Sequence, residues 1–427
     1  MEKEYSKGRL FATLFALGIS GGSIFIIPYI KFVFYDLQIQ VTGMTNTESA
    51  LLLTVYSIAS LVLDIPGGMI CDKIDSKKGL LFALLCTTLV TLIYAFVNTS
   101  FIISMIIWAI LAFTTMAIYW PIFSKVLNIL GKKTGVSGRA GATFGWYYAF
   151  NGISAAILQA IALWASTQFA TPVANFRAAI FVAAGSTLLA TILVMFLFDK
   201  DMVAPTPDMA SEMITEKKNS KFDLSQLGTV LKMPMVWAIM LVCMIAYCMY
   251  SMMSYFTPYL TAVVGVSPSA SGAIAIIRTY VFLILALVGG TIADRVFKGT
   301  AKWIMIVFIA CACIIGGLLL LPKGSSAMFV SIYTLLPAAL VQMSYPIKYS
   351  VIGEVGINPY LFATVTGLAA FFGALPDLIL GPIIGSLLDS RGNDAYTILF
   401  IILIVLLIIG AVCAYAIVRH KKNIVTE

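Results

Sequence analysis

The sequence contains few charged residues. Only 11% of its 427 residues are charged and 61% are hydrophobic, with a mean hydropathy of +1.00. Soluble domains are about 25% charged and roughly 45–50% apolar, so this composition excludes a water-soluble chain. The apolar runs are continuous over about twenty residues or more, whereas a membrane barrel would show segments of about ten alternating residues. We therefore predict an all-α membrane protein.

Histidine and paired cysteine motifs are also scarce. The one histidine is His420, so a proton carrier inside the membrane has to be a carboxylate. No Cys-x-x-Cys pair occurs, which argues against a zinc site or a disulfide framework. The sequence also lacks His-Glu-x-x-His and a phosphate-binding P-loop, which argues against a zinc hydrolase or an ATP-driven pump. We predict no cofactor and no metal.

The apolar runs predict twelve transmembrane helices, the first of them retained rather than cleaved as a signal peptide. Their expected ranges are 10–36, 48–71, 79–97, 101–127, 141–165, 177–198, 235–263, 269–293, 303–321, 326–352, 361–387 and 395–418.

Lysine and arginine are distributed unevenly between the two sides of these helices. With the N-terminus inside, 20 of the 27 lie in cytoplasmic segments and three (Arg177, Lys323 and Arg391) lie outside. Positive residues favour the cytoplasmic side, so both termini are expected there. This distribution accounts for the net charge of +8 without a nucleic-acid partner.

Two motifs occur twice. GGMICDK at 67–73 returns as GGTIADR at 289–295, 222 residues later, and WPI at 120–122 returns as YPI at 345–347, 225 residues later. Two matches at nearly one period predict a duplicated chain with two six-helix bundles. We expect bundles at 1–198 and 235–427, joined by a cytoplasmic linker at 199–234 that contains a short amphipathic helix.

The Gly-x-x-x-Asp-(Arg or Lys) motif resembles the cytoplasmic loop signature of the major facilitator superfamily, and the resemblance covers essentially the whole chain. It implies two bundles with a substrate site near mid-membrane between them. The first copy departs from the family pattern at Asp75 and Ser76, where the family usually has glycine and a base. The cytoplasmic gate positions implied here are Gly68, Asp72, Lys73, Gly290, Asp294 and Arg295.

Two further stretches, Trp120-Pro121 and residues 144–152, resemble the organophosphate and organic-anion branch of the superfamily. Its phosphate exchangers hold the anion with an arginine in helix one and another in helix seven. Here helix one offers Lys31, and the second base could only be Arg278 in helix eight. Strict phosphate exchange is therefore not implied, and a sulfonate, sugar acid or other carboxylate stays open.

Ionisable residues inside a membrane are costly and usually functional. We expect Lys31 and Arg278 to bind substrate, unless Lys31 reaches the headgroups and Arg278 pairs with Asp377. Asp377, Asp64 and Glu354 are candidates for proton coupling or gating. Two more bases lie at cytoplasmic helix ends: Lys125 is a substrate candidate, whereas we interpret Lys348 as an ordinary boundary residue.

Polar and aromatic residues complete the candidate substrate site: Tyr29, Trp120, Trp146, Asn151, Tyr247 and Tyr250. Each could equally pack or form an interhelical hydrogen bond.

Taken together, these features predict a secondary transporter that takes up a small organic anion with protons by alternating access. We expect it to work as a monomer among the lipids of a bacterial inner membrane. The alternative is a proton-driven drug exporter, suggested by the methionines of helix seven. A membrane sensor or an intramembrane enzyme is a different class with no motif to support it.

Overall fold

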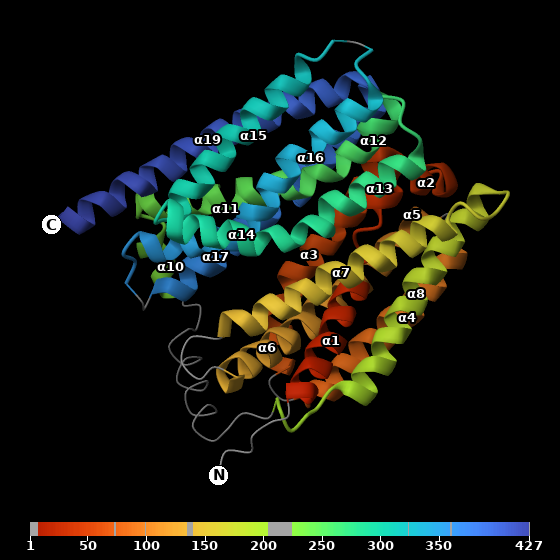
Figure 1. Cartoon of the computed structure of the whole chain (residues 1–427), viewed down its shortest axis with the longest axis horizontal. Coiled ribbons are helices and arrows are strands. Elements are labelled where there is room, and N and C mark those ends of the chain that lie inside the picture. The colour runs from red at the N-terminus through yellow and green to blue at the C-terminus, as the bar shows by residue number, and fades with distance from the viewer. Residues whose placement is uncertain are drawn as a thin grey trace. The chain divides into compact units, whose positions relative to one another are not determined.

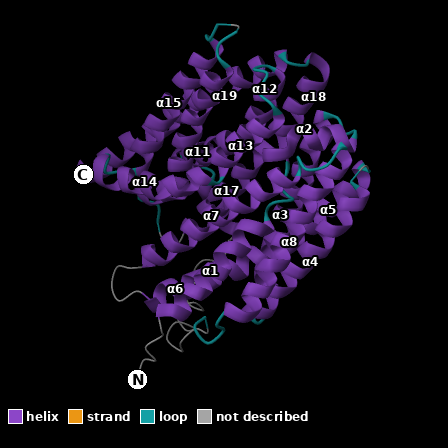
Figure 2. Cartoon of the chain, turned by 45° about the vertical axis from the view of Figure 1, so that its right-hand side comes forward, coloured by secondary structure: helices purple, strands orange, loops and turns teal. Residues whose placement is uncertain are grey.

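The structure is a computed structural model that describes residues 7–71, 74–98, 100–134, 140–203, 224–322, 324–358 and 361–426. Within these ranges every regular element is a helix, as Figure 2 shows. Eleven helical stretches of the described chain are long and apolar enough to cross a membrane. The chain is thus an all-α, multi-pass membrane protein, as predicted, while twelve spans and cytoplasmic termini stay predictions.

The chain groups into two units by its internal contacts. The first contains Met1–Pro205 and Ser267–Leu283, and the second contains Thr206–Val266 and Ile284–Glu427. The division into bundles at 1–198 and 235–427 stays a prediction. The contact grouping assigns one stretch of the expected second bundle, 267–283, to the first unit.

The described residues of the first unit form these helices, labelled in Figure 1: α1 (Lys7–Ile24), α2 (Lys31–Thr42), α3 (Asn46–Cys71), α4 (Ser76–Val97), α5 (Phe101–Ala112), α6 (Trp120–Thr134), α7 (Ala140–Ala165), α8 (Pro172–Leu197) and α13 (Pro268–Thr279). A π-helical segment, Phe113–Tyr119, joins α5 to α6, and a 3₁₀ turn at Val281–Ile284 follows α13.

The second unit contains α10 (Leu224–Val230), α11 (Pro234–Met252), α12 (Phe256–Ala262), α14 (Leu285–Thr291), α15 (Thr300–Leu319), α16 (Ala327–Ser344), α17 (Phe362–Leu375), α18 (Gly381–Arg391) and α19 (Asp394–Thr426). Short irregular helical segments at Met253–Tyr255, Ile292–Val296, Tyr345–Glu354 and Pro376–Leu380 connect them.

The first predicted helix, 10–36, is interrupted in the structure. Helix α1 ends at Ile24, six residues form turns, and α2 begins at Lys31. Pro28 lies in this break and has no backbone N–H to donate, which disfavours a continuous helix. Lys31 therefore stands at the start of a second helix.

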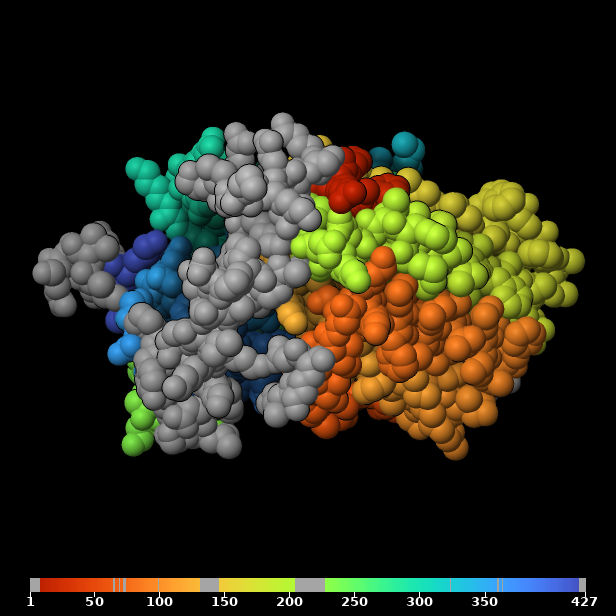
Figure 3. All heavy atoms as spheres, turned by 90° about the horizontal axis from the view of Figure 1, so that it is seen from below, coloured from red at the N-terminus to blue at the C-terminus, as the bar shows by residue number. Residues whose placement is uncertain are grey.

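Helix α1 packs closely on α7, and the two lie side by side in Figure 1. A Cβ atom added at Gly18 would collide with Phe150, and one added at Gly21 would collide with Asn151 and Tyr147. Small residues permit this close approach between membrane helices, where packing rather than water exclusion drives association. Helices α4 and α8 are also neighbours, and their surfaces border each other in Figure 3.

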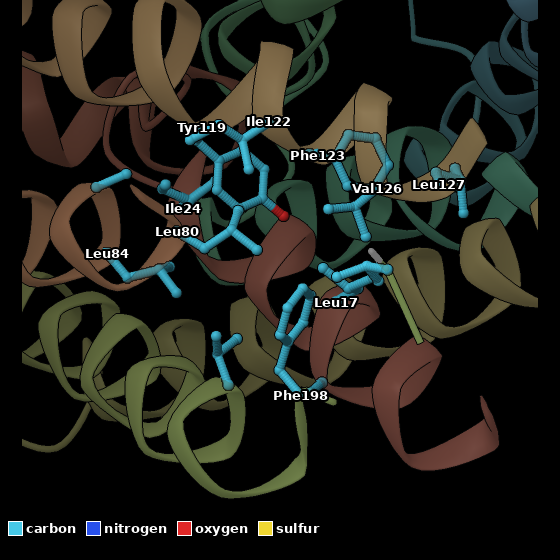
Figure 4. Close-up of a cluster of buried hydrophobic side chains, with 14 of the residues drawn as sticks. Leu17, Ile24, Leu80, Leu84, Tyr119, Ile122, Phe123, Val126, Leu127 and Phe198 are labelled. Carbon is cyan, nitrogen blue, oxygen red and sulfur yellow. The ribbon is translucent and has the colours of Figure 1, made fainter. Parts of the chain in front are cut away.

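The core of the first unit is apolar and aromatic (Figure 4). It joins Leu17 of α1, Leu80 of α4, Tyr119 and Phe123 around the start of α6, and Phe198 after α8. All five side chains are at most 2% exposed. This core fixes the start of α6, where the repeated aromatic-proline motif lies.

Each copy of the loop motif places its first glycine against a backbone. A Cβ added at Gly67 would collide with the Ala117 carbonyl, and one at Gly289 with the Met343 carbonyl. Ala117 and Met343 each lie shortly before the aromatic-proline motif of their own unit. The two motifs of each half are therefore in contact, and each glycine is required for close approach.

Candidate functional site

Buried charged side chains are the candidate functional residues of each unit. In the described part of the chain these are Lys31, Arg278, Lys348 and Asp377, each at most 5% exposed. A buried charge is costly unless it is paired or hydrogen-bonded. Three buried bases against one buried acid give these interiors a positive balance.

Lys31 lines a small pocket of the first unit, whose walls are Pro28, Ile30, Lys31, Gln38, Ser49, Leu52, Leu53 and Trp108. The polar groups here are hydrogen-bonded. The Ser49 hydroxyl donates to Gln38 Oε1 at 3.3 Å, and Trp108 Nε1 donates to the Pro28 carbonyl at 3.1 Å. Tyr29 instead joins an aromatic cluster, with its ring 5.8 Å from that of Tyr56. The lining places the base beside amide and hydroxyl groups, and the space between them is too small for a water molecule.

Arg278 lies in the last turn of α13 and is fully buried. Helix α13 contacts both α2 and α7, and Gly272 permits its approach to the Val33 carbonyl of α2. Just beyond the helix, the Tyr280 hydroxyl accepts a hydrogen bond from Gln159 Nε2 at 3.0 Å. The two predicted anion ligands therefore stand on helices that contact each other within one unit.

Four predicted residues of α6 and α7 have different surroundings. Asn151 Nδ2 donates to the Tyr147 hydroxyl at 2.8 Å, so it forms part of a buried polar contact. Trp120 and Trp146 are 40% and 56% exposed. Lys125 is half-buried on α6. The polar network nearest to Asn151 continues through Tyr119, which shares a 2.8 Å hydrogen bond with Ser20.

Asp377 lies in the π-helical segment that follows Pro376, within the second unit. Its carboxylate accepts a 2.5 Å hydrogen bond from the Tyr247 hydroxyl and a second bond from the Ser251 hydroxyl, both on α11. Two donors from one helix hold this acid in place, which is how a buried carboxylate is normally satisfied.

Lys348 is held by aromatic rings. From Tyr345 to Glu354 the chain is a 3₁₀ helix, in which side chains three residues apart eclipse each other. This geometry places Lys348 Nζ over the Tyr345 ring, 3.7 Å from its centroid, and 4.6 Å from that of Tyr349. Tyr345 in turn stacks on Tyr250 at 4.6 Å, and Tyr250 lies 6.2 Å from Tyr247. We call Lys348, Tyr345, Tyr349, Tyr250 and Tyr247 the lysine-tyrosine cluster.

The contacts with the aromatic rings do not offset the free-energy cost of burying the Lys348 ammonium. Removing an ammonium from water costs several kcal/mol even after relaxation, whereas a desolvated cation–π contact returns about 2 kcal/mol. No carboxylate in the described part of the chain forms an ion pair with Lys348. The cluster is therefore complementary to a negative charge that the described chain does not supply.

The internal repeat aligns Lys348 of the second half with Phe123 of the first half. An offset of 225 residues aligns Trp120-Pro121-Ile122-Phe123 with Tyr345-Pro346-Ile347-Lys348. Phe123 is 2% exposed and stacks on Tyr119 at 5.8 Å. The same position thus holds an apolar ring in one half and a buried ammonium in the other.

The gate positions that the structure describes have open or exposed surroundings. Gly68 has no neighbour near its added Cβ, Gly290 approaches only Ile347, and Asp294 and Arg295 are exposed. Asp72 and Lys73 lie outside the described residues, and so does the side chain of Asp64.

Asp75, where the first motif departs from the family pattern, is the N-cap of α4. Its carboxylate accepts from the Lys78 amide at 3.0 Å. The departure therefore supplies a helix cap.

Glu354 braces helix ends. Its carboxylate accepts from the backbone amides of Thr300 (2.5 Å) and Ala301 (3.2 Å) at the start of α15, and it lies 3.5 Å from Lys421 Nζ of α19. A carboxylate at a helix N-terminus satisfies exposed amides and the helix dipole. A gating role for Glu354 stays a prediction.

Four residues that complete these contacts were not among the predicted site residues: Lys348 and Tyr345 in the second unit, Ser251 beside Asp377, and Tyr147 beside Asn151. The signal for Lys348 was available, because extending the aromatic-proline match by one residue opposes a lysine to a phenylalanine. Ser251 shows no signal in the sequence.

Known proteins similar to this chain are membrane proteins. The family model described as Major Facilitator Superfamily matches residues 10–379. Inner membrane protein YqcE of Escherichia coli (strain K12) is 25% identical over 391 residues, covering 91% of this chain and 89% of the relative. Inner membrane protein YihN of the same strain is 25% identical over 407 residues, covering 95% and 94%.

Solved structures share the fold. A bacterial homolog of the human lysosomal transporter Spinster, in an inward-facing unoccupied conformation, aligns with a TM-score of 0.75 at 14% identity, covering 98% of this chain and 99% of that one. The nucleoside transporter NupG, as a mutant, aligns with a TM-score of 0.67 at 13% identity, covering 96% and 99%. At these identities the likeness concerns the fold alone.

Proposed function

The chain belongs to the major facilitator superfamily of membrane transporters, and we propose that it is a secondary transporter of a small organic anion that works by alternating access. The observation that carries the proposal is the excess of buried bases: Lys31, Arg278 and Lys348 against Asp377 among the described residues. Buried charge of one sign attracts a ligand of the opposite sign. A carboxylate, sulfonate or phosphate group fits this balance.

Lys31 and Arg278 are the proposed anion ligands of the first unit. The planar guanidinium of Arg278 can donate two parallel hydrogen bonds to a carboxylate or phosphate. Lys31 adds a point charge on α2, which contacts α13.

Asp377 is the proposed proton carrier. It is the one buried carboxylate in the described part of the chain, and its position after Pro376 gives it two hydroxyl partners on another helix. Protonation would free Tyr247 and Ser251 to adopt other hydrogen bonds, which couples the acid to α11. The direction is uptake, and the location is a bacterial inner membrane, in line with the names of the two E. coli relatives.

The drug-exporter alternative has weaker support. Four of the methionines that suggested it, Met240, Met249, Met252 and Met253, are at most 1% exposed and belong to the packed interior of the second unit.

The test is uptake by proteoliposomes that contain the purified protein. We expect uptake of labelled D-gluconate or glucose 6-phosphate, stimulated when the outside is more acidic than the inside. An excess of methanesulfonate should compete, and tetraphenylphosphonium should not. Efflux or binding of the hydrophobic cation without any anion transport would contradict the proposal.

A further inference from the structure

The lysine-tyrosine cluster has the composition of an anion-binding subsite. The ammonium of Lys348 is 5% exposed and is contacted by two ring faces, Tyr345 at 3.7 Å and Tyr349 at 4.6 Å. Ring faces stabilise the cation but leave its charge in place, so the local potential stays positive.

A purely structural role does not explain a lysine at this position. In the first unit the equivalent residue is Phe123, which fills the interior with an apolar ring. The duplicated fold is thus compatible with a neutral side chain here. A charge that the fold does not require, in an interior where charge is costly, points to a ligand.

The residues around Lys348 favour a hydroxylated anion. Tyr250, Tyr345 and Tyr349 bring phenol groups that both donate and accept hydrogen bonds, and Tyr247 links the cluster to Asp377 through its 2.5 Å hydrogen bond. An ammonium beside several phenols matches a ligand with one anionic group and several hydroxyl groups.

We propose that Lys348 binds the anionic group of the transported substrate and that the surrounding tyrosines contact its hydroxyl groups, which makes the substrate a sugar acid or sugar phosphate. The proposal rests on the anion transport proposed above. It adds a binding residue in the second unit and narrows the ligand to hydroxylated anions.

The experiment measures the rise in apparent melting temperature of the detergent-purified full chain with D-gluconate, glucose 6-phosphate, inorganic phosphate and hexanoate, at constant ionic strength. Selective binding to the folded state raises this temperature. Three variants are compared with the wild type: Lys348→Met, which keeps the length and removes the charge, Lys348→Arg, which keeps the charge, and Lys302→Met. Lys302 is an exposed lysine that also lies over a ring, 5.9 Å from the Phe297 centroid, and serves as the matched control.

We expect Lys348→Met to keep its melting temperature without ligand and to weaken anion affinity by about tenfold or more, as the loss of a charged contact implies. Lys348→Arg should keep most of the affinity, and Lys302→Met should match the wild type. D-gluconate should bind more tightly than hexanoate.

Three results would overturn the inference. Unchanged affinity in Lys348→Met, with binding lost in Arg278→Gln, would remove Lys348 from the site and leave the proposed function intact. Equal binding of D-gluconate and hexanoate would overturn the hydroxylated class. No anion-dependent shift in the wild type would overturn both this inference and the proposed function.

Discussion

The two halves of the molecule bury different side chains at the same position of the repeated aromatic-proline motif. Where the aromatic-proline motif occurs, the first half continues as the α-helix α6 and packs Phe123 into its core (Figure 4). The second half changes to a 3₁₀ helix and buries Lys348 on tyrosine rings. We attribute this difference to the anion binding proposed for Lys348.

The contacts between the first and fifth helices of each half show a similar contrast. In the first unit, glycines of α1 approach Asn151 and Ser154 of α7, and the contact is neutral. In the second unit, Tyr247 and Ser251 of α11 hold the charged Asp377. The described second half therefore carries a buried acid and a buried base, whereas Lys31 and Arg278 supply the charge of the first unit.

The largest effect is expected at Arg278. Replacing it with glutamine should reduce anion uptake by about a hundredfold or more, because losing one side of a buried charged contact costs about 2–5 kcal/mol. The measurement is initial uptake by proteoliposomes at matched protein content. Arg177→Gln is the control, since Arg177 is half-buried and bonds to the Ala95 carbonyl. Normal uptake by folded Arg278→Gln would remove this residue from the site.

Exchanging the two repeat positions should separate folding from function. Phe123→Lys buries an ammonium in an apolar core and should destabilise the first unit by about 3 kcal/mol or more. Lys348→Phe should leave the protein folded, with anion affinity weakened by about tenfold or more. Gel filtration and thermal unfolding in detergent report on both. A stable Phe123→Lys protein would show that this position tolerates charge in either half. The difference between Phe123 and Lys348 would then no longer support a binding role for Lys348.

Asp377→Asn should uncouple transport from protons. The amide keeps a similar shape but cannot carry the charge, so uphill accumulation should fall by about tenfold while exchange of labelled for unlabelled anion continues. Uptake with and without a pH gradient, compared with counterflow, measures the two activities separately. Accumulation that still follows the pH gradient in this variant would exclude Asp377 as the carrier.

The smallest effect is expected at Glu354. Glu354→Gln removes a charge from the start of α15 and should cost about 1 kcal/mol of stability, in the range of a lost helix cap. Thermal unfolding of the variant, with Lys421→Met as its partner variant, measures this effect. Loss of transport with unchanged stability would instead support the predicted gating role.

Much of the fold followed from the sequence, because membrane helices are long, apolar and separated by positive loops. Eleven predicted spans correspond to described helical stretches. The break before Lys31 was missed because its residues are as apolar as the helix around them. Changes of helix type, such as the 3₁₀ segment at Tyr345–Glu354, were also missed, since a proline predicts a disturbance but not its geometry.

The candidate site was only partly predictable. The burial of Lys31, Arg278 and Asp377 agrees with their apolar sequence surroundings. Lys348 was interpreted as a boundary residue because it lies close to the cytoplasmic end of its helix, and sequence position alone cannot report that its side chain is enclosed. Partners such as Ser251 depend on which helices meet, which a single sequence does not specify.

We propose above that the buried bases Lys31, Arg278 and Lys348 bind an anionic substrate. The most direct measurement is the melting temperature of the wild-type protein during titration with D-gluconate, glucose 6-phosphate and methanesulfonate, against tetraphenylphosphonium, at constant ionic strength. We expect at least one anion to raise the melting temperature in a saturable way and the cation to have no effect. Stabilisation by tetraphenylphosphonium alone would contradict the proposal and would favour an exporter of hydrophobic cations.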